Sequence, residues 1–285
     1  MKAILTLLVA LASIQSWALE QEETVVDMTP GVDVLDPANL GPLLKQGDPK
    51  ALNNIGLLWA RGYQGRQSWA EALHWWKEAA KQGYTVSMNN LGLAYANGDG
   101  APSDFQEAFK WWHQSAFLGN AWAMNAVGDL YENGQGVEVN FQMAMTWYKS
   151  AAEQGDALGM YNVGALHEAG KGVTQNYAEA LSWYRRAADK GEASSMHAIG
   201  KMYLEGRGVA ADSVEACAWL IVADKKFPPQ DARDALSNRN ELSALRAQLD
   251  QAQREAAAQR ARSIDALTTP PKPEPKNLKP SEKAT

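Results

Sequence analysis

Three carboxylates, Asp129, Glu132 and Glu168, are the residues of this sequence best placed to do chemistry. Glu168 follows Glu132 by a step of 36 residues, which is the period of a repeat described below. Carboxylates on adjacent repeats would lie roughly 10 Å apart, near the span that inverting glycoside hydrolases use. Separate acid and base roles also require a closed environment around each group. We therefore favour an acidic patch that is solvated or that meets a basic partner segment.

The other reactive side chains do not form a site. Cys217 is the only cysteine, so no internal disulfide can form, and we expect it to be a small buried residue. No two of the four histidines, His74, His113, His167 and His197, have the spacing of metal ligands. The Gly-x-Gly pairs end predicted helices rather than follow strands, so no phosphate loop is expected. The sequence thus predicts no catalytic residue, no metal and no cofactor.

A pattern of 36 residues repeats along the chain without insertion and starts at five glycines, Gly47, Gly83, Gly119, Gly155 and Gly191. Each copy also has two further glycines, an alanine and a tryptophan at fixed positions, which in the first copy are Gly56, Gly62, Ala72 and Trp75. A second ring follows the tryptophan in four copies, and Leu220 takes its place in the fifth. A fixed period of this length is typical of stacked helical units.

Each copy reads as two helices. The first is predicted from Pro49 to Arg61, with Leu52, Ile55 and Trp59 on one face, and Gly62 ends it. The second follows a good N-cap residue in every copy, namely Ser68, Asp104, Asn140, Asn176 and Asp212. A glutamate three residues later predicts a capping box in four copies, and Met143 is the exception.

Two residues of each copy should decide how its helices pack. Gly56 lies inside a helix, where glycine costs about 1 kcal/mol relative to alanine, so we expect a close helix contact there to compensate. Trp75 is expected to supply much of the buried surface. Because no single copy can bury both helices, the copies must stack.

The chain resembles the Sel-like repeat family, a branch of the tetratricopeptide-type helical solenoids. The resemblance rests on the motifs Met160–Gly164, Glu168–Val173 and Ala180–Ala188, and it covers Gly47 to about Asp224. It implies an all-α fold, which we expect to be a right-handed α-solenoid of five 36-residue helix-turn-helix repeats with capping helices. Members mostly act as interaction scaffolds. Some secreted relatives with hydrolase activity carry paired cysteines in each unit, which this chain lacks.

The regions outside the repeats have distinct compositions. Residues 1–18 read as a secretory signal peptide cleaved after Ala18, and no membrane span is expected after cleavage. Residues 19–35 read as a flexible lead-in and residues 36–46 as an N-terminal capping helix. The repeats are expected at 47–82, 83–118, 119–154, 155–190 and 191–226. The prolines and lysines of residues 268–285 predict a disordered tail.

Residues 227–267 are expected to form C-terminal capping helices. The motif from Asn238 to Glu241 predicts a capping box that opens a long helix to about Leu267, after a short helix from Asp231. One face of the long helix carries Leu242, Leu245, Leu249, Ala252 and Ala256. This face either covers the last repeat or forms a dimeric coiled coil.

A second face of each first helix is expected to bind the partner. Residues 50, 53, 57 and 60 share it by their spacing, and in related solenoids this face lines the concave surface. The residues at these positions differ between copies. The expected partner-binding residues are Asn89, Leu93, Trp122, Asn125, Asp129, Glu132, Leu158, Tyr161 and Glu168. Trp122 is either a recognition anchor or a ring packed on its neighbours.

We expect a periplasmic or secreted, monomeric bacterial protein that binds a protein or an extended peptide of the cell envelope. The net charge of −6 and the absence of a basic stripe argue against nucleic acid. A cell-wall hydrolase or carbohydrate-binding protein is the alternative from another class. A third possibility is a negative regulator that holds the outer domain of a membrane sensor.

Overall fold

The computed structural model describes residues 47–62, 67–228 and 231–269, and over these residues it contains twelve α-helices and no strand. The first five pairs are α3 (Pro49–Arg61) and α4 (Trp69–Ala80), α5 (Thr85–Asn97) and α6 (Phe105–Phe117), α7 (Ala121–Asn133) and α8 (Phe141–Glu153), α9 (Ala157–Ala169) and α10 (Tyr177–Ala188), and α11 (Ala193–Glu205) and α12 (Ser213–Lys226). Two more helices follow, α13 (Ala232–Gln248) and α14 (Gln251–Thr268). The predicted signal peptide, lead-in and N-terminal capping helix, and the tail from residue 270, lie outside the described residues.

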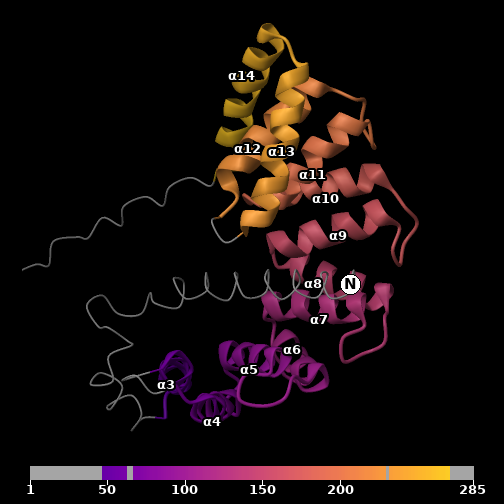
Figure 1. The fold of residues 1–285 in the computed structure, drawn as a ribbon. Coiled ribbons are helices and arrows are strands. Elements are labelled where there is room, and N and C mark those ends of the chain that lie inside the picture. Colours follow the sequence, from indigo (N-terminus) through magenta and orange to yellow (C-terminus); the bar gives the residue numbers. More distant parts are fainter. Residues whose placement is uncertain (1–46, 63–66, 229–230, 270–285) are drawn as a thin grey trace, which may run out of the picture.

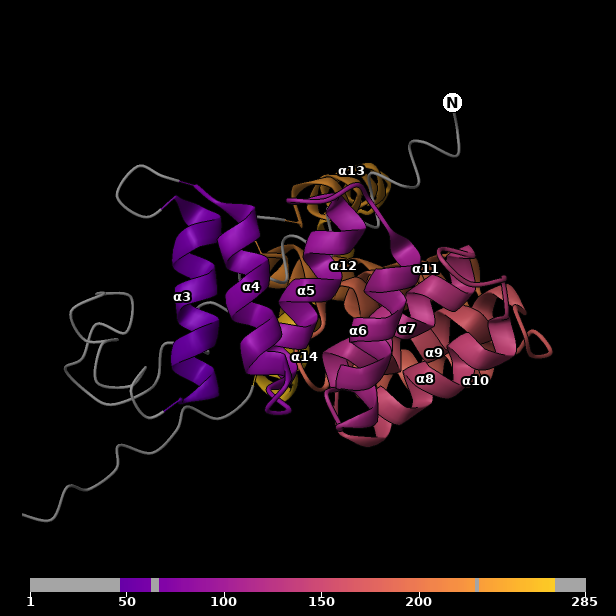
Figure 2. The ribbon, with the colours of Figure 1, turned by 90° about the horizontal axis from the view of Figure 1, so that it is seen from below.

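The five pairs follow one another along a stack, from α3 and α4 at one end to α11 and α12 at the other (Figure 1). The view from below shows α3 to α10 in succession across the molecule, with α11 to α14 behind them (Figure 2). Each second helix packs against the first helix of its own pair, and α4, α6, α8 and α10 also pack against the first helix of the next pair. The last second helix, α12, packs against α13 and α14 instead. The predicted all-α solenoid of five repeats is therefore confirmed.

The predicted helix boundaries follow from local backbone chemistry. Every first helix ends at a glycine with positive φ, as at Gly62 with φ 88° and Gly134 with φ 69°. All five predicted N-cap side chains accept a hydrogen bond from a backbone N–H of the first turn. The glutamate half of the predicted capping box is engaged elsewhere at two positions. Glu215 accepts from Trp219 Nε1 at 3.1 Å, and Glu107 pairs with Lys110.

The glycine inside the first helix faces a ring of its own repeat in the first four repeats, and Leu220 takes the place of the ring in the fifth. A Cβ at Gly92 would lie 2.1 Å from Trp112 Nε1, and one at Gly128 would lie 2.4 Å from the Tyr148 ring. This close contact confirms why glycine is used inside the helix. The ring that faces the glycine is the second of the pair: Trp76 is buried, whereas Trp75 is partly buried and packs on the cluster of Ala51 and Ile55. Adjacent helix residues point about 100° apart, so only one ring of the pair can face the glycine.

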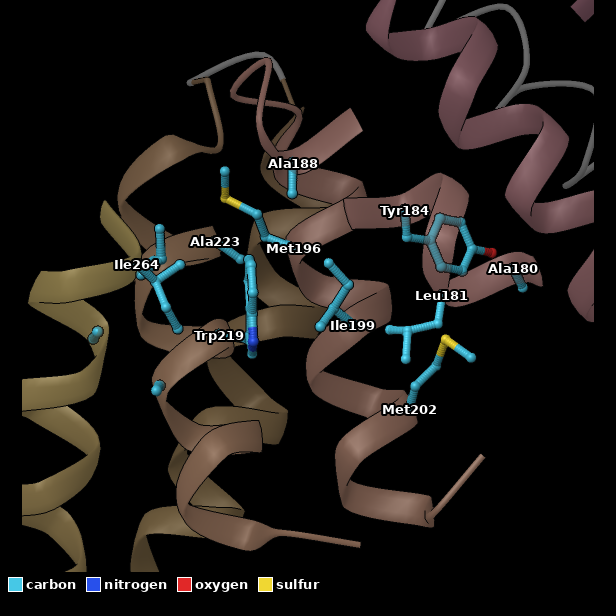
Figure 3. Close-up of a cluster of buried hydrophobic side chains, with 13 residues drawn as sticks. Ala180, Leu181, Tyr184, Ala188, Met196, Ile199, Met202, Trp219, Ala223 and Ile264 are labelled. Carbon is cyan, nitrogen blue, oxygen red and sulfur yellow. The ribbon is translucent and has the colours of Figure 1, made fainter. Parts of the chain in front are cut away.

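The core between the fourth and fifth pairs shows how the stack is joined. It contains Leu181 and Tyr184 of α10, Met196 and Ile199 of α11, and Trp219 of α12. Ile264 of α14 packs into the same cluster (Figure 3). One continuous apolar cluster thus links two repeats and the C-terminal helices.

The C-terminal helices cover α12, and their boundaries differ from the prediction. Asn238 does not begin a helix: it lies within α13, fully buried, and donates from Nδ2 to the Leu220 carbonyl oxygen at 3.0 Å. The capping box is instead formed by Asp250 and Gln253 at the start of α14. The break between α13 and α14 also shifts the apolar face, so that Ala257 is buried rather than Ala252 or Ala256.

The apolar face proposed for a coiled coil is used within the chain. Leu242, Leu245 and Leu249 pack in one cluster with Cys217 and Leu220 of α12. Cys217 is buried, as expected, and burial raises the pKa of its thiol. The C-terminal helices therefore cover the last repeat.

We expect Gly92→Ala to lower the melting temperature, although alanine favours an isolated helix by about 1 kcal/mol. The added Cβ would overlap the Trp112 ring, and overpacking of this kind costs ~1–3 kcal/mol. Thermal unfolding of Gly92→Ala, Trp112→Leu and the double variant checks this. The double variant should lose less melting temperature than the two single variants added together, because the smaller leucine leaves room for the added Cβ. A leucine already faces Gly200 in the fifth repeat. A higher melting temperature for Gly92→Ala would contradict the packing account.

Candidate partner-binding surface

We call the nine predicted partner-binding residues the first-helix face, because all lie on α5, α7 or α9. Its asparagines join neighbouring repeats. Asn89 Nδ2 donates to Asn120 Oδ1 at 3.2 Å, and Asn125 Nδ2 donates to Asp156 Oδ1 at 2.7 Å. Asn120 and Asp156 are the N-caps of α7 and α9. These two amides therefore fix the spacing of successive first helices.

Trp122 packs inside the stack. Its side chain is only 7% exposed. Its ring meets the Trp112 ring edge to face, with ring centroids 5.7 Å apart and planes at 83°. Of the two sequence interpretations, this geometry supports packing rather than an exposed anchor. Leu93 and Leu158 are the apolar residues of the first-helix face that stay partly exposed.

Asp129 and Glu132 share one tyrosine. Tyr148 Oη lies 2.6 Å from Asp129 Oδ1 and 3.1 Å from Glu132 Oε2. A hydroxyl carries one proton and can donate it to only one carboxylate at a time. Burial raises the pKa of Asp129 to about 7, and the Glu132 charge adds to this against the opposing Tyr148 hydrogen bond. A proton held on Asp129 lets it donate to Tyr148 while Tyr148 donates to Glu132.

Glu132 and Glu168 also reach the next repeat. Glu132 Oε1 pairs with Lys171 Nζ at 2.8 Å. One repeat on, Glu168 Oε1 lies 3.4 Å from Arg207 Nη1, and its Oε2 accepts from Tyr184 Oη at 2.7 Å. Each glutamate is thus held between a tyrosine of its own repeat and a lysine or arginine just after the first helix of the next repeat. Both sets of contacts tie neighbouring repeats together.

The role of these tyrosines, and of Lys171 and Arg207, was not predicted, although two positions of the repeat change together in the sequence. In the first two repeats the buried ring is Trp76 or Trp112, and its Nε1 donates to a backbone carbonyl at 3.2 Å. Alanine occupies the glutamate position in those repeats, at Ala60 and Ala96. The ring changes to tyrosine in the third and fourth repeats, where the alanine becomes glutamate. Comparing the copies with one another at both positions would have revealed the pairing.

Tyr161 lies half-buried at the centre of the acidic part of this surface. Its ring contacts the Tyr184 ring, with centroids 5.6 Å apart. Burial raises the pKa of Tyr161 to about 12, and the charges of Glu192, Asp234, Glu168 and Glu132 act in the same direction. The negative charges of several helices therefore act on Tyr161.

A hydrolase would need an acid and a base that face a common substrate. The raised pKa of Asp129 would suit the acid of such a pair. Its Oδ1, however, is already hydrogen-bonded to the Tyr148 hydroxyl. In the described part of the chain, no group of three or more His, Cys, Asp or Glu side chains could hold a metal ion. Within that part, no helix has both the length and the apolar character needed to cross a membrane.

The shared proton predicts a pH dependence of stability. The pKa of Asp129 is raised in the folded protein, so the folded state binds a proton that the unfolded chain releases above pH 3.8. The corresponding stability is complete below that pH and is lost as the pH rises through about 7. Asp129→Asn keeps a donor towards Tyr148 without a titrating group. Its stability relative to wild type should rise by about 4 kcal/mol from low to high pH, which is the rise of the pKa from 3.8 to about 7 converted to free energy.

Urea unfolding of wild type, Asp129→Asn and the exposed control Glu153→Gln at several pH values measures this difference. A constant gap between wild type and Asp129→Asn across the range would show that Asp129 is an ordinary ionised carboxylate.

The comparisons agree with this geometry. The Sel1 repeat model matches residues 49–84, 85–120, 123–156, 157–192 and 193–223. No curated protein matches the chain. Among solved structures, c5321, described as a protective antigen of uropathogenic Escherichia coli with an SLR fold, is 32% identical with a TM-score of 0.63. The match covers 68% of this chain and 41% of that one, so this chain matches less than half of that relative.

A Sel1 repeat protein from Oxalobacter formigenes is 30% identical with a TM-score of 0.62, and the match covers 67% of this chain and 79% of that one. The five matched repeats span most of the described residues, and each overlaps one of the five helix pairs. The chain belongs to the Sel1 repeat family.

Proposed function

We propose that this protein is a non-catalytic scaffold that binds a partner protein, or an extended peptide of that protein, along its first-helix face. Sel1 repeats generally mediate protein–protein interaction, which supports binding as the type of function. The observation that carries the proposal is the contrast between two sets of positions. Positions that face the core, such as Gly92 and Ala108, keep their residue types from copy to copy, whereas those of the first-helix face change.

The contacts described above divide the first-helix face into support and contact surface. Trp122, Asn89 and Asn125 are engaged with neighbouring helices and support the surface from within. Leu93 and Leu158 remain partly exposed and supply apolar contact area. Asp129, Glu132, Glu168 and Tyr161 supply polar groups whose positions are fixed by their contacts. Such preorganised side chains lose little entropy when a partner binds.

The N-terminal sequence supports a partner in the bacterial cell envelope. Lys2, the apolar run from Ala3 to Ile14 and the small residue Ala18 form the pattern of an export signal. On this proposal the protein acts in the periplasm or outside the cell.

Partner capture tests the proposed face. We expect the double variant Leu93→Gln, Leu158→Gln to lose most cross-linked partner in an envelope extract, because it removes the partly exposed apolar contacts. The matched control is Phe117→Gln, which removes a large apolar side chain that is 82% exposed at the end of α6. Quantitative mass spectrometry of captured proteins compares the three. If Phe117→Gln loses the partner and the double variant keeps it, the partner binds a surface other than the first-helix face.

Export is tested separately by sequencing the N-terminus of the protein recovered from the periplasmic fraction. Cleavage after Ala18 should leave Leu19 as the first residue. A protein that keeps Met1 and stays in the cytoplasmic fraction would contradict the envelope role and leave the binding proposal standing.

A further inference from the structure

A histidine stands in the fifth repeat at the position by which earlier repeats are joined. His197 of α11 is equivalent to Asn89 of α5 and Asn125 of α7, whose amides donate to the N-cap of the next first helix. No further repeat follows α12 among the described residues, and α13 lies at this end of the stack (Figure 1). Nδ1 of His197 lies 3.0 Å from Asn238 Oδ1 on α13. The link to the C-terminal helices therefore uses a titratable ring in place of an amide.

The hydrogen bonds of Asn238 fix which nitrogen of His197 carries a proton. A backbone carbonyl can only accept, so the group of Asn238 that lies 3.0 Å from the Leu220 oxygen is its NH2. The amide oxygen of Asn238 then faces His197, and Nδ1 donates to it. In a neutral imidazole whose Nδ1 carries the hydrogen, Nε2 has a lone pair and no hydrogen.

Nε2 of His197 faces a carboxylate oxygen that lacks a donor. It lies 3.5 Å from Glu241 Oε2 on α13, which is buried and receives no hydrogen bond. Two atoms that can only accept therefore face each other when the ring is neutral and the carboxylate is ionised. One proton on Nε2 turns this contact into an attraction between opposite charges. Water can supply the proton, because the side chains of His197 and Glu241 are 16% and 30% exposed.

The other charged groups around this pair leave Nε2 to Glu241. Lys201 Nζ lies 3.9 Å from Glu241 Oε1, the oxygen that does not face His197. Glu192 at the N-cap of α11 and Asp234 of α13 act on Tyr161. Further charged side chains of α10, α12, α13 and α14 are engaged elsewhere, namely Arg185 with Tyr203, Arg239 with Asp224, Arg260 with Glu215, and Lys225 and Lys226 with Asp265.

We propose that a proton bound between His197 and Glu241 fastens α13 to the last repeat, so that the C-terminal helices loosen when the imidazole loses this proton. The inference goes beyond the proposed function and does not rest on it. On this proposal the closed form binds the proton more tightly than the unfolded chain does. The stability that the proton supplies is then complete below about pH 6.5, where an unfolded histidine is protonated, and is lost as the pH rises further.

The thiol of Cys217 reports whether α13 is in place. Leu242 and Leu245 of α13, and Leu249 just after it, pack in one cluster with Cys217 of α12. Cys217 is buried there and is the only cysteine of the sequence. A thiol reagent can reach it only when the C-terminal helices move away.

The rate at which a maleimide labels Cys217 in the full chain tests the inference. Division by the rate for the urea-unfolded protein at the same pH removes the titration of the thiol itself. We expect this relative rate for wild type to rise on the order of 10-fold from about pH 5.5 to about pH 8.5. His197→Asn places the residue of the second and third repeats at this position, keeps a donor towards Asn238, and should show no such rise.

Two further variants sharpen the test. Glu241→Gln offers an amide N–H to the neutral ring, so its Cys217 should be labelled more slowly than that of wild type at the higher pH. The matched control His74→Asn changes an exposed histidine of α4 and should keep the wild-type rise. Circular dichroism checks that each variant is folded. A constant relative rate in wild type, an equal rise in folded His197→Asn, or no slower labelling of folded Glu241→Gln at the higher pH would each overturn the inference.

Discussion

The close contact between an interior glycine and a large side chain of the second helix sets the geometry of every repeat, and that side chain is a ring in the first four. At Gly56 and Gly92 a side chain of any size would meet the tryptophan of the second helix. Without the Cβ, the two helices of each pair approach closely, and their common apolar face is buried against the next pair. Each pair alone would leave that face in water, so stability depends on neighbours. The first-helix face is therefore held in place by a core to which every repeat contributes.

The ring that faces the interior glycine is of two kinds in the first four repeats. In the first two repeats an indole fills the space against the glycine and donates to a backbone carbonyl. In the third and fourth repeats a phenol fills it, and its hydroxyl reaches a carboxylate of the first helix. Glu132 and Glu168, which accept from these hydroxyls, also pair with Lys171 and Arg207 of the next repeat, and these ion pairs add a link between repeats. The tyrosines thus connect the buried core with the acidic part of the first-helix face.

Much of the fold could be predicted from local signals. Glycines with positive φ and N-cap residues act within one turn of the chain, so the ends of the paired helices followed from the sequence alone. The position of Trp122 could not be predicted, because its burial depends on Trp112 in the preceding repeat. The position of Asn89 and Asn125 changes to tyrosine and histidine in the last two copies, as on a solvent face, but both asparagines bind the N-cap of the next first helix. Asn238 resembled a cap in sequence, yet its amide satisfies a carbonyl of α12.

The central claim is that a modular stack holds a specific binding surface on its first helices. Deletion of residues 119–154 tests it most directly, because one whole 36-residue repeat is removed in register. Asn89 would then face Asp156 as Asn125 does now, so the account predicts a cooperatively folded helical protein. It also predicts that this protein no longer captures the partner, because α7 is gone. A deletion variant that cannot fold, or one that captures the partner as well as wild type, would contradict the account.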